Sequence, residues 1–236
     1  MQKIISTARA AIDRYDMIDD GDRIAIGVSG GKDSVALLYC LAQLRRFYPK
    51  KFDIHAVILD PQFNNIPYDY GKIEKLCLEL GVELTIKRTH FWEIIFDIRK
   101  ESNPCSLCAR MRRGLLHDTA KELSCNKIAL GHHLDDATET FYMNLFEGGN
   151  IACFQPVSYL SRKELFMIRP LIFAREKAIS AAVERTELPI VKSRCPVDGN
   201  TKREKTKQLL AELETHCADI HTKTIGALQR GNISNW

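Results

Sequence analysis

The sequence lacks any long apolar run. No stretch of its 236 residues approaches the roughly 20 consecutive apolar residues that span a bilayer. The first residues, MQKIISTARAAIDRYDMIDDGD, carry acids and bases throughout and do not form a signal peptide. We therefore expect a cytoplasmic protein with no membrane segment. In that reducing compartment the eight cysteines are expected to be metal ligands, nucleophiles or buried apolar residues rather than disulfide partners.

A strong net charge is also missing. The chain has 34 Lys and Arg against 30 Asp and Glu, a formal charge of +4, which permits a nucleic-acid partner but does not indicate one. No internal repeat and no linker rich in Pro, Gly or Ser divides the sequence. We therefore predict one domain over residues 1–236, with an N-terminal helix in 1–20 and a C-terminal helical extension in 200–236.

Buried strands alternate with amphipathic helices along the chain. The pattern predicts strands at 23–29, 53–60, 82–88 and 127–131, and helices at 3–18, 35–47, 68–80, 105–122, 135–146 and 175–187, with loop and short strands over 148–170 and one or two basic helices over 202–228. This alternation indicates an α/β fold with a doubly wound, mostly parallel sheet and helices on both faces. Ligands of such sheets bind beyond the carboxyl ends of the strands.

Two common nucleotide-binding patterns are absent. Neither GxxxxGK[ST] nor GxGxxG occurs, but SGGKDS (29–34) lies between a predicted strand and a predicted helix. Two glycines let the backbone approach a polyphosphate, and the helix N-terminus presents free amides to it. Lys32 adds a positive charge, and Asp33 beside a phosphate suggests a magnesium ion between them. An ordinary strand-to-helix turn is the less favoured alternative.

A second polar segment, GHHLDDATET (131–140), follows the fourth predicted strand. Asp135 and Asp136 are expected at the strand end, facing the phosphate loop. Adjacent carboxylates at a helix start are also common caps, so capping remains an alternative for this pair.

The cysteines divide into two groups. CSLC (105–108) has the spacing of metal ligands on a turn that leads into a helix, and Cys195 in SRCPVDG lies outside any apolar pattern. Three thiolates favour a [4Fe–4S] cluster whose fourth iron position stays open for sulfur. A zinc site completed by His132 or His133, and a redox-active pair, are the alternatives. The other cysteines are interpreted mainly as small buried apolar residues: Cys40, Cys77, Cys125, Cys153 and Cys217.

These motifs together resemble a known family. SGGKDS resembles the PP-loop signature of the ATP-pyrophosphatase superfamily, and GHHLDD resembles the segment that accompanies it in tRNA-modifying branches. CSLCARMRRGLL (105–116), KIALGHHLDD (127–136) and IRPLIFAREK (168–177) resemble the tRNA 2-thiocytidine synthetase (TtcA) family. The resemblance covers most of the chain, from about residue 22 to residue 195. It implies a PP-loop, Rossmann-like (adenine nucleotide α-hydrolase-like) fold that cleaves ATP between its α- and β-phosphates.

The resemblance also implies roles for individual residues. Lys32, Asp33, Asp136 and Cys195 would act in catalysis. The ATP-binding residues would be Ser29, Gly30, Gly31, Lys32, Asp33, Ser34, Leu59, Gly131 and Asp136. Cys105, Cys108 and Cys195 would hold a [4Fe–4S] cluster. The third ligand departs from the family pattern, because the family carries CNLC after its PII segment, whereas this chain carries PIVKSRCPVDG.

Basic residues flank the proposed site. We assign RNA phosphate contacts to Arg110, Arg112, Arg113, Arg194, Lys202 and Arg203. The predicted function is ATP-dependent tRNA thiolation, in which a base carbonyl, expected at C2 of cytidine, is adenylated and then replaced by sulfur. ATP, Mg²⁺ and the cluster are the implied cofactors. tRNA and a sulfur donor, either a cysteine desulfurase or inorganic sulfide, are the implied partners, and a homodimer stays open.

Three alternatives to this function remain. A 2-thiouridine-type thiolase would use the same motifs on another base, and a lysidine synthetase-like ligase would not need the cysteines. A nucleotide- and metal-binding RNA-binding protein would show no turnover. Cys195 could also carry a persulfide instead of binding the cluster.

Overall fold

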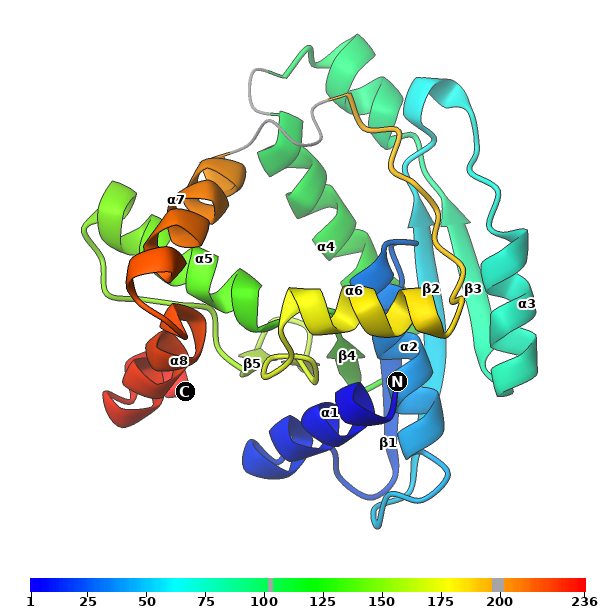
Figure 1. Cartoon of the computed structure of the whole chain (residues 1–236). Helices are drawn as coiled ribbons and strands as arrows, with labels where there is room; N and C mark the ends of the chain where they lie inside the picture. Colours follow the sequence, from blue (N-terminus) through cyan, green and yellow to red (C-terminus); the bar gives the residue numbers. More distant parts are fainter. Residues whose placement is uncertain (102–103, 197–201) are drawn as a thin grey trace.

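A six-stranded sheet forms the centre of the chain (Figure 1). A computed structural model describes residues 1–101, 104–196 and 202–236. The strand order is β3-β2-β1-β4-β6-β5, and all neighbours pair in parallel except β5, which is antiparallel to β6. The strands are β1 (Asp22–Gly27), β2 (Phe52–Asp60), β3 (Glu83–Arg88), β4 (Lys127–Ala129), β5 (Val157–Leu160) and β6 (Leu165–Ile168).

The central strands are buried on both faces. Ile24 and Ile26 of β1 point into the larger apolar core, while Ala25 between them belongs to a second cluster on the opposite face. In β2, Ile58 and Leu59 divide between the two faces in the same way. Because successive side chains of a strand point to opposite faces, these strands appear in the sequence as continuous apolar runs.

Helices cover both faces. The α-helices are α1 (Gln2–Arg14), α2 (Lys32–Leu44), α3 (Gly71–Leu80), α4 (Pro104–Glu122), α5 (Leu134–Gly148), α6 (Glu176–Arg185), α7 (Lys202–His216) and α8 (Ile220–Arg230). Helix α2 contacts α1, α3 and α6 on one face, whereas α4 packs against β1, β2 and β4 on the other. Helices α5, α7 and α8 contact one another beside the sheet (Figure 1). The doubly wound α/β prediction is confirmed.

The strand order reverses between β1 and β4, which pair in the middle of the sheet. The chain leaves β1 toward β2 on one side and leaves β4 toward β6 on the other, so a crevice is expected beyond their carboxyl ends. The phosphate loop follows β1, and Gly131 lies two residues beyond β4. The predicted strands and long helices are present with boundaries shifted by a few residues.

Short helical segments were not predicted. A π-helix spans Glu93–Ile98, and 3₁₀ turns span Phe63–Asn65 and Ile233–Asn235. None of the helices in the described ranges is long and apolar enough to cross a membrane.

Candidate active site

The phosphate loop is closed by its own serines. Ser34 Oγ donates to the Gly31 carbonyl oxygen at 2.8 Å, and the Ser29 amide donates to Ser34 Oγ at 3.1 Å. Gly31 occupies the N-cap of α2 and has no side chain to accept from the first helical amides. Those amides therefore remain available to an anion at the positive end of the helix.

Two glycines permit close packing around this loop. Gly30 has φ +88° and lies against Val191, whose Cβ would be 3.0 Å from a Cβ at position 30. Gly131 approaches the next turn of chain so closely that a Cβ there would lie 3.0 Å from the Asp33 carbonyl carbon and 3.1 Å from the Ser34 amide nitrogen. The β4–α5 connection therefore rests directly on the start of α2.

Beyond the carboxyl ends of β1, β2 and β4 lies a cavity of about 450 Å³ that we name the histidine cavity. Its walls include His117 and His132, and several residues predicted to bind ATP: Ser29, Asp33, Ser34, Leu59, Gly131 and Asp136. The histidine cavity thus combines the amide end of α2 with apolar side chains of the strand ends, as a nucleotide site requires.

A second cavity of about 420 Å³, the cysteine cavity, lies on the other side of the phosphate loop. Cys105, Cys108 and Cys195 all line it, together with aromatic side chains from the segment after β2. Ser29, Ala109 and Arg112 line both cavities. The phosphate loop therefore borders the cavity of the three cysteines, and these shared residues separate that cavity from the histidine cavity.

The CSLC segment forms the first turn of α4, in agreement with the helix predicted over 105–122, and no separate turn precedes that helix within CSLC. Helix α4 begins at Pro104, whose fixed φ suits the first helical position and whose missing N–H costs no helical hydrogen bond. Cys105 and Cys108 are three residues apart on this first turn, so they share one face of the helix. Arg112 lies one turn further and lines the cavity with them.

The three sulfurs lie close enough to influence one another. Burial raises the pKa of the Cys108 thiol, Arg112 opposes this effect, and Cys195 and Cys105 add to it. Among the described residues, no group of three or more His, Cys, Asp and Glu side chains converges on a point that could hold one metal ion. Thiolates of an iron–sulfur cluster bind separate irons and stand further apart than the ligands of one ion. Three thiols around one cavity match a cluster with one open iron, whereas a structural zinc site normally has four protein ligands.

The segment that carries Cys195 is anchored on an aromatic side chain. The Arg194 guanidinium lies 4.1 Å from the Tyr68 ring centroid, and the Arg194 amide donates to Tyr68 Oη at 2.6 Å. The fully buried carboxylate of Asp60 accepts from the Tyr68 amide at 3.0 Å and from the Gln62 amide at 2.9 Å. Asp60, at the end of β2, therefore shapes the wall on which the Cys195 segment rests.

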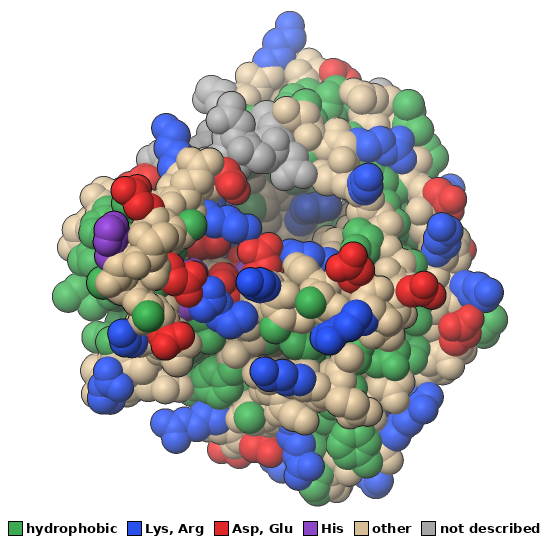
Figure 2. Space-filling model, viewed as in Figure 1, with side chains coloured by type: hydrophobic (Ala, Val, Ile, Leu, Met, Phe, Trp, Pro, Cys, Tyr) green, Lys and Arg blue, Asp and Glu red, His purple; other side chains and the backbone are tan. Residues whose placement is uncertain are grey.

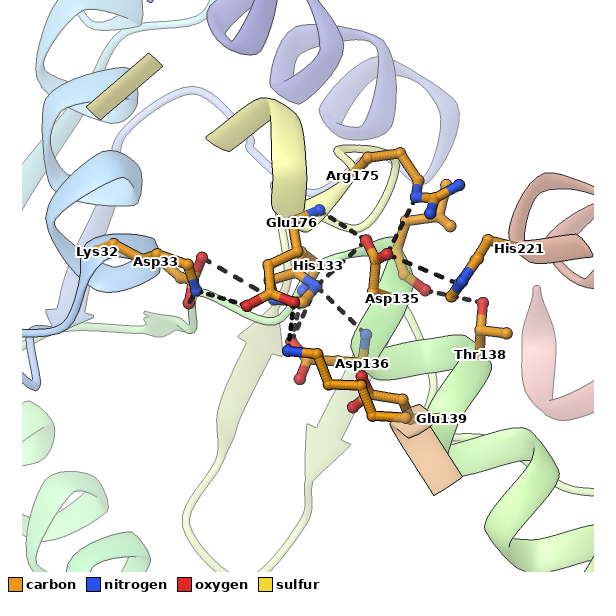
Figure 3. Close-up of polar contacts among 12 residues, drawn as sticks. Lys32, Asp33, His133, Asp135, Asp136, Thr138, Glu139, Arg175, Glu176 and His221 are labelled. Atoms are coloured by element: carbon orange, nitrogen blue, oxygen red, sulfur yellow. Dashed lines mark hydrogen bonds and ion pairs between the residues drawn. The ribbon is translucent and has the colours of Figure 1, made fainter. Parts of the chain in front are cut away.

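A capping box fixes the connection between β4 and α5. His133 Nδ1 accepts from the Asp136 amide at 3.2 Å, and Asp136 Oδ2 accepts from the His133 amide at 2.9 Å. The other ring nitrogen of His133 lies 3.9 Å from Asp33 Oδ1 (Figure 3). His133 therefore acts as a cap and links the two loops that contribute to the histidine cavity.

Lys32 is held between carboxylates. Its Nζ lies 2.9 Å from Asp33 Oδ2 and 2.9 Å from Glu176 Oε1, and Glu176 Oε2 accepts from Lys207 Nζ at 2.7 Å. Burial would raise the pKa of Glu176, but the hydrogen bonds from Lys207 and Lys32 hold it at about 2. Burial would likewise lower the pKa of Lys32, and its two carboxylate partners raise it. Lys32 therefore stays protonated beside the phosphate loop.

Helix α7 contributes a second cation to this region. Arg203 lies 3.3 Å from Asp136 Oδ1 and 3.6 Å from Glu139 Oε2. Glu139 is 4% exposed, and burial, with help from the nearby Asp136 charge, raises its pKa to about 7. The carboxylates around the loop are thus partly balanced by basic residues of a helix far away in the sequence.

The two adjacent aspartates have different surroundings. Asp135 Oδ1 accepts from Arg175 Nε at 3.0 Å, and Asp135 Oδ2 accepts from the Glu176 amide at 2.6 Å, so Asp135 braces the start of α6. Asp136 lines the histidine cavity and caps α5. The capping interpretation of this helix start therefore describes Asp136, which also lines the cavity, whereas Asp135 holds the start of α6 instead.

The remaining predicted residues are distributed unevenly. Arg112 lines both cavities and Arg113 lines the histidine cavity, whereas Arg110 is exposed and lines neither. The Lys202 side chain lies outside the described residues. Figure 2 shows a hollow in the face above α6, with Lys, Arg, Asp and Glu side chains around it. Sequence reasoning missed Tyr68, Glu139, Glu176 and His117. Glu139 and Glu176 lie within the quoted segments GHHLDDATET and IRPLIFAREK but were given no role, whereas Tyr68 and His117 lie outside any motif.

The five cysteines outside this site were interpreted mainly as buried apolar residues, and only some of them are buried. Cys40, Cys77 and Cys125 are buried and support it, Cys153 is half-buried, and Cys217 is exposed. For Cys217 the buried interpretation is therefore wrong, because it follows the last turn of α7 on the surface.

Comparison with known proteins places this geometry in context. The profile of the PP-loop domain matches residues 3–211. A curated tRNA-cytidine(32) 2-sulfurtransferase of Syntrophotalea carbinolica is 37% identical over 235 residues, covering 98% of this chain and 89% of the relative. The protein of the same name from Pelobacter propionicus is 39% identical over 221 residues, covering 92% of this chain and 81% of the relative.

A solved structure resembles the fold. The U34-tRNA thiolase NcsA from Methanococcus maripaludis, solved with its [4Fe–4S] cluster, superposes with a TM-score of 0.77 at 25% identity. The match covers 95% of this chain and 77% of that protein.

Proposed function

This chain belongs to the PP-loop family of tRNA 2-sulfurtransferases and is an ATP-dependent tRNA-thiolating enzyme, and we propose that its substrate is cytidine 32 of tRNA, converted to 2-thiocytidine. The observation that carries the proposal is that Ser29, Ala109 and Arg112 line both cavities. A base bound at this shared wall would meet an activating nucleotide on one side and sulfur on the other. We further propose that residues 1–236 act as one domain.

ATP is proposed to occupy the histidine cavity, with its base near Leu59 and its phosphates on the first amides of α2. The C2 carbonyl oxygen of the base attacks the α-phosphorus, the bond to the β-phosphate oxygen breaks, and pyrophosphate leaves. Lys32, kept protonated by Asp33 and Glu176, stabilises the charge on the leaving group. Asp33 Oδ1, buried without a hydrogen-bond partner, and Asp136 are the carboxylates suited to the magnesium ion that accompanies ATP.

Sulfur delivery is assigned to the cysteine cavity. Cys105, Cys108 and Cys195 would hold a [4Fe–4S] cluster, which would supply an iron with an open position for a small sulfur species. Sulfur attacks C2 of the adenylated base, and AMP leaves with the former carbonyl oxygen. Adenylation is needed because oxide is a very poor leaving group and AMP is a good one. Arg112, in both cavities, is positioned to contact the phosphate that becomes AMP.

The RNA would enter over the basic residues around these cavities. Arg113 and Arg194 are exposed and lie beside the histidine and cysteine cavities, so both can reach RNA phosphates. Arg110, Lys202 and Arg203 are assigned more peripheral contacts. A nucleotide flipped out of its loop would then reach the shared wall. A sulfur donor, either a cysteine desulfurase or inorganic sulfide, must reload the site after each turnover.

The experiment that tests the proposal uses purified chain with its cluster reconstituted, ATP, sulfide and tRNA from cells that lack the gene. Pyrophosphate release and formation of 2-thiocytidine are measured together, the latter by mass spectrometry of nucleosides. We expect both products, at position 32. Pyrophosphate without any thionucleoside would contradict the proposal, and modification of another base would restrict it to tRNA thiolation in general.

A further inference from the structure

The histidine cavity contains unusual polar atoms. In the described part of the chain, six buried side-chain nitrogen or oxygen atoms have no hydrogen-bond partner. Three of these belong to residues that line the histidine cavity, namely Asp33 Oδ1, His117 Nε2 and His132 Nδ1. Buried polar atoms are nearly always paired, so a concentration of unpaired ones in one cavity marks a place where a bound ligand or ordered water supplies the partners.

The three atoms lie at different parts of the cavity. Asp33 is on the first turn of α2, and His132 follows Gly131 at the end of β4, so both belong to the phosphate-loop side. His117 lies on α4, five residues or about 7.5 Å along the helix axis from Arg112. Its neighbour Leu116 packs against Gly27, 3.2 Å from the position of a Cβ there. His117 therefore follows Arg112 along α4 and lies near the carboxyl end of β1, in a cavity that apolar side chains also line.

The side chain of His117 is suited to an uncharged ligand. The residue is 8% exposed, and burial together with the Arg113 charge lowers its pKa. Asp118 opposes that effect and Lys163 adds to it. A neutral imidazole offers one donor and one acceptor, which matches the edge of a heterocycle better than a phosphate. Leu59, Leu116 and Met167 line the same cavity and provide apolar contacts for the faces of such a ring.

We infer that His117 is a specificity-determining residue that hydrogen-bonds the adenine base of ATP through Nε2. The inference rests on the proposed function, because it requires ATP in the histidine cavity. On the edge of adenine that we assign to His117, the base presents a donor, its exocyclic amino group, and an acceptor, N7. Either tautomer of His117 can therefore pair with the base. His117 takes no part in the chemical steps.

The test measures equilibrium binding of nucleotides without tRNA. Wild type, H117F, H117L and H117Q are titrated with ATP, with purine riboside triphosphate, which lacks the amino group, and with 7-deaza-ATP, which lacks N7. We expect H117F and H117L to bind ATP about tenfold more weakly, the equivalent of one hydrogen bond. Wild type should bind one of the two analogues, the one that lacks the group paired with His117, about tenfold more weakly than ATP. H117F and H117L should bind that analogue no more weakly than they bind ATP. H117Q, which keeps a donor and an acceptor, should recover part of the affinity.

Two results would overturn the inference. One is unchanged ATP affinity in whichever of H117F and H117L folds, as judged by thermal unfolding. The other is an equal further loss for both analogues, which would mean that His117 only shapes the cavity. H90F is the matched control, since the side chain of His90 is 76% exposed and lines neither cavity. Absence of ATP binding by wild type would contradict the proposed function instead.

Discussion

The histidine cavity and the cysteine cavity share a wall but are built in different ways. The first lies at the ends of β1, β2 and β4, and its loops are fixed by the Ser34 hydrogen bonds and the capping box of His133 and Asp136. The second is formed by the first turn of α4, the segment after β2, the π-helix and the segment around Cys195. The difference teaches that the proposed nucleotide site depends on the sheet, whereas the proposed sulfur site depends mainly on segments attached around the sheet.

The largest expected effect is a loss of thiolation without a loss of ATP affinity. Replacing Cys105, Cys108 or Cys195 with Ala should lower thiolation by at least about a hundredfold, because a transition-state interaction is removed. ATP affinity should change by less than about twofold, because none of the three lines the histidine cavity. Product formation and nucleotide titration measure the two effects. C217S is the control, since Cys217 is exposed. Undiminished thionucleoside in the C105A/C108A protein would contradict the cluster assignment, whereas a modified nucleoside without sulfur would favour a lysidine synthetase-like ligase.

The opposite result, a loss of ATP affinity without a loss of iron, is expected from Gly131→Ala. A Cβ at this position would meet the backbone of Asp33 and Ser34 at 3.0–3.1 Å, so the start of α2 must shift. Overpacking of this kind costs about 1–3 kcal/mol of unfolding free energy. We expect weaker ATP binding but an unchanged iron content, measured by nucleotide titration and metal analysis.

Gly114→Ala is the matched control, because nothing lies within 4 Å of a Cβ there and the position is inside α4. It should raise the free energy of unfolding by about 0.5–1 kcal/mol. Loss of iron in G131A with intact ATP binding would contradict this expectation, because it would mean that Gly131 supports the cysteine cavity rather than the proposed nucleotide site.

A smaller effect follows from Glu139, beside the histidine cavity. Its folded pKa of about 7 lies above the ordinary value of 4.5, so between these pH values the unfolded chain has lost a proton that the folded chain keeps. Stability should therefore fall as pH rises from about 4.5 to 7 and then level off, by up to about 3 kcal/mol. Glu139→Gln should remove this slope, whereas Glu164→Gln, at an exposed site, should keep it. Urea unfolding across this pH range measures both.

The smallest effect concerns the link between α7 and the phosphate loop. Glu176, with a pKa of about 2, contributes stability that is present above pH 4.5 and is lost as pH falls toward 2. Lys207→Met removes one of its two cationic partners, so the acid-induced loss should begin at higher pH. Because both partners are partly exposed, the loss at pH 7 should be about 1 kcal/mol or less. Lys205→Met, exposed on the same helix, is the control, and an identical acid transition in both variants would contradict the assignment.

Sequence patterns predicted the sheet because its central strands are buried on both faces and therefore appear as uninterrupted apolar runs. Long helices were predicted by their periodicity. The π-helix at 93–98 was missed, since EIIFDI is too short to show a helical period and carries no start signal.

The site was predicted as far as motifs reach. Motifs predicted the phosphate loop between a strand and a helix, and a helix that starts at CSLC; in the structure Cys195 lines the same cavity as Cys105 and Cys108. They could not separate Asp135 from Asp136, because their different partners come from α6 and α7. His117 has no sequence signal, since its isolation from hydrogen-bond partners exists only once α4 packs on the sheet.

Helix α4 fixes the spacing between the side chains that line the cysteine cavity and those that line the histidine cavity. It carries Cys105 and Cys108 on its first turn, Arg112 at the shared wall and His117 beyond, without interruption. Inserting one residue inside it would rotate everything that follows by about 100° and displace it by about 1.5 Å, moving one set of side chains away from its cavity. Insertions and deletions between Cys108 and His117 should therefore abolish turnover even where the fold survives. Changes in length after Glu122, at the end of the helix, should be tolerated.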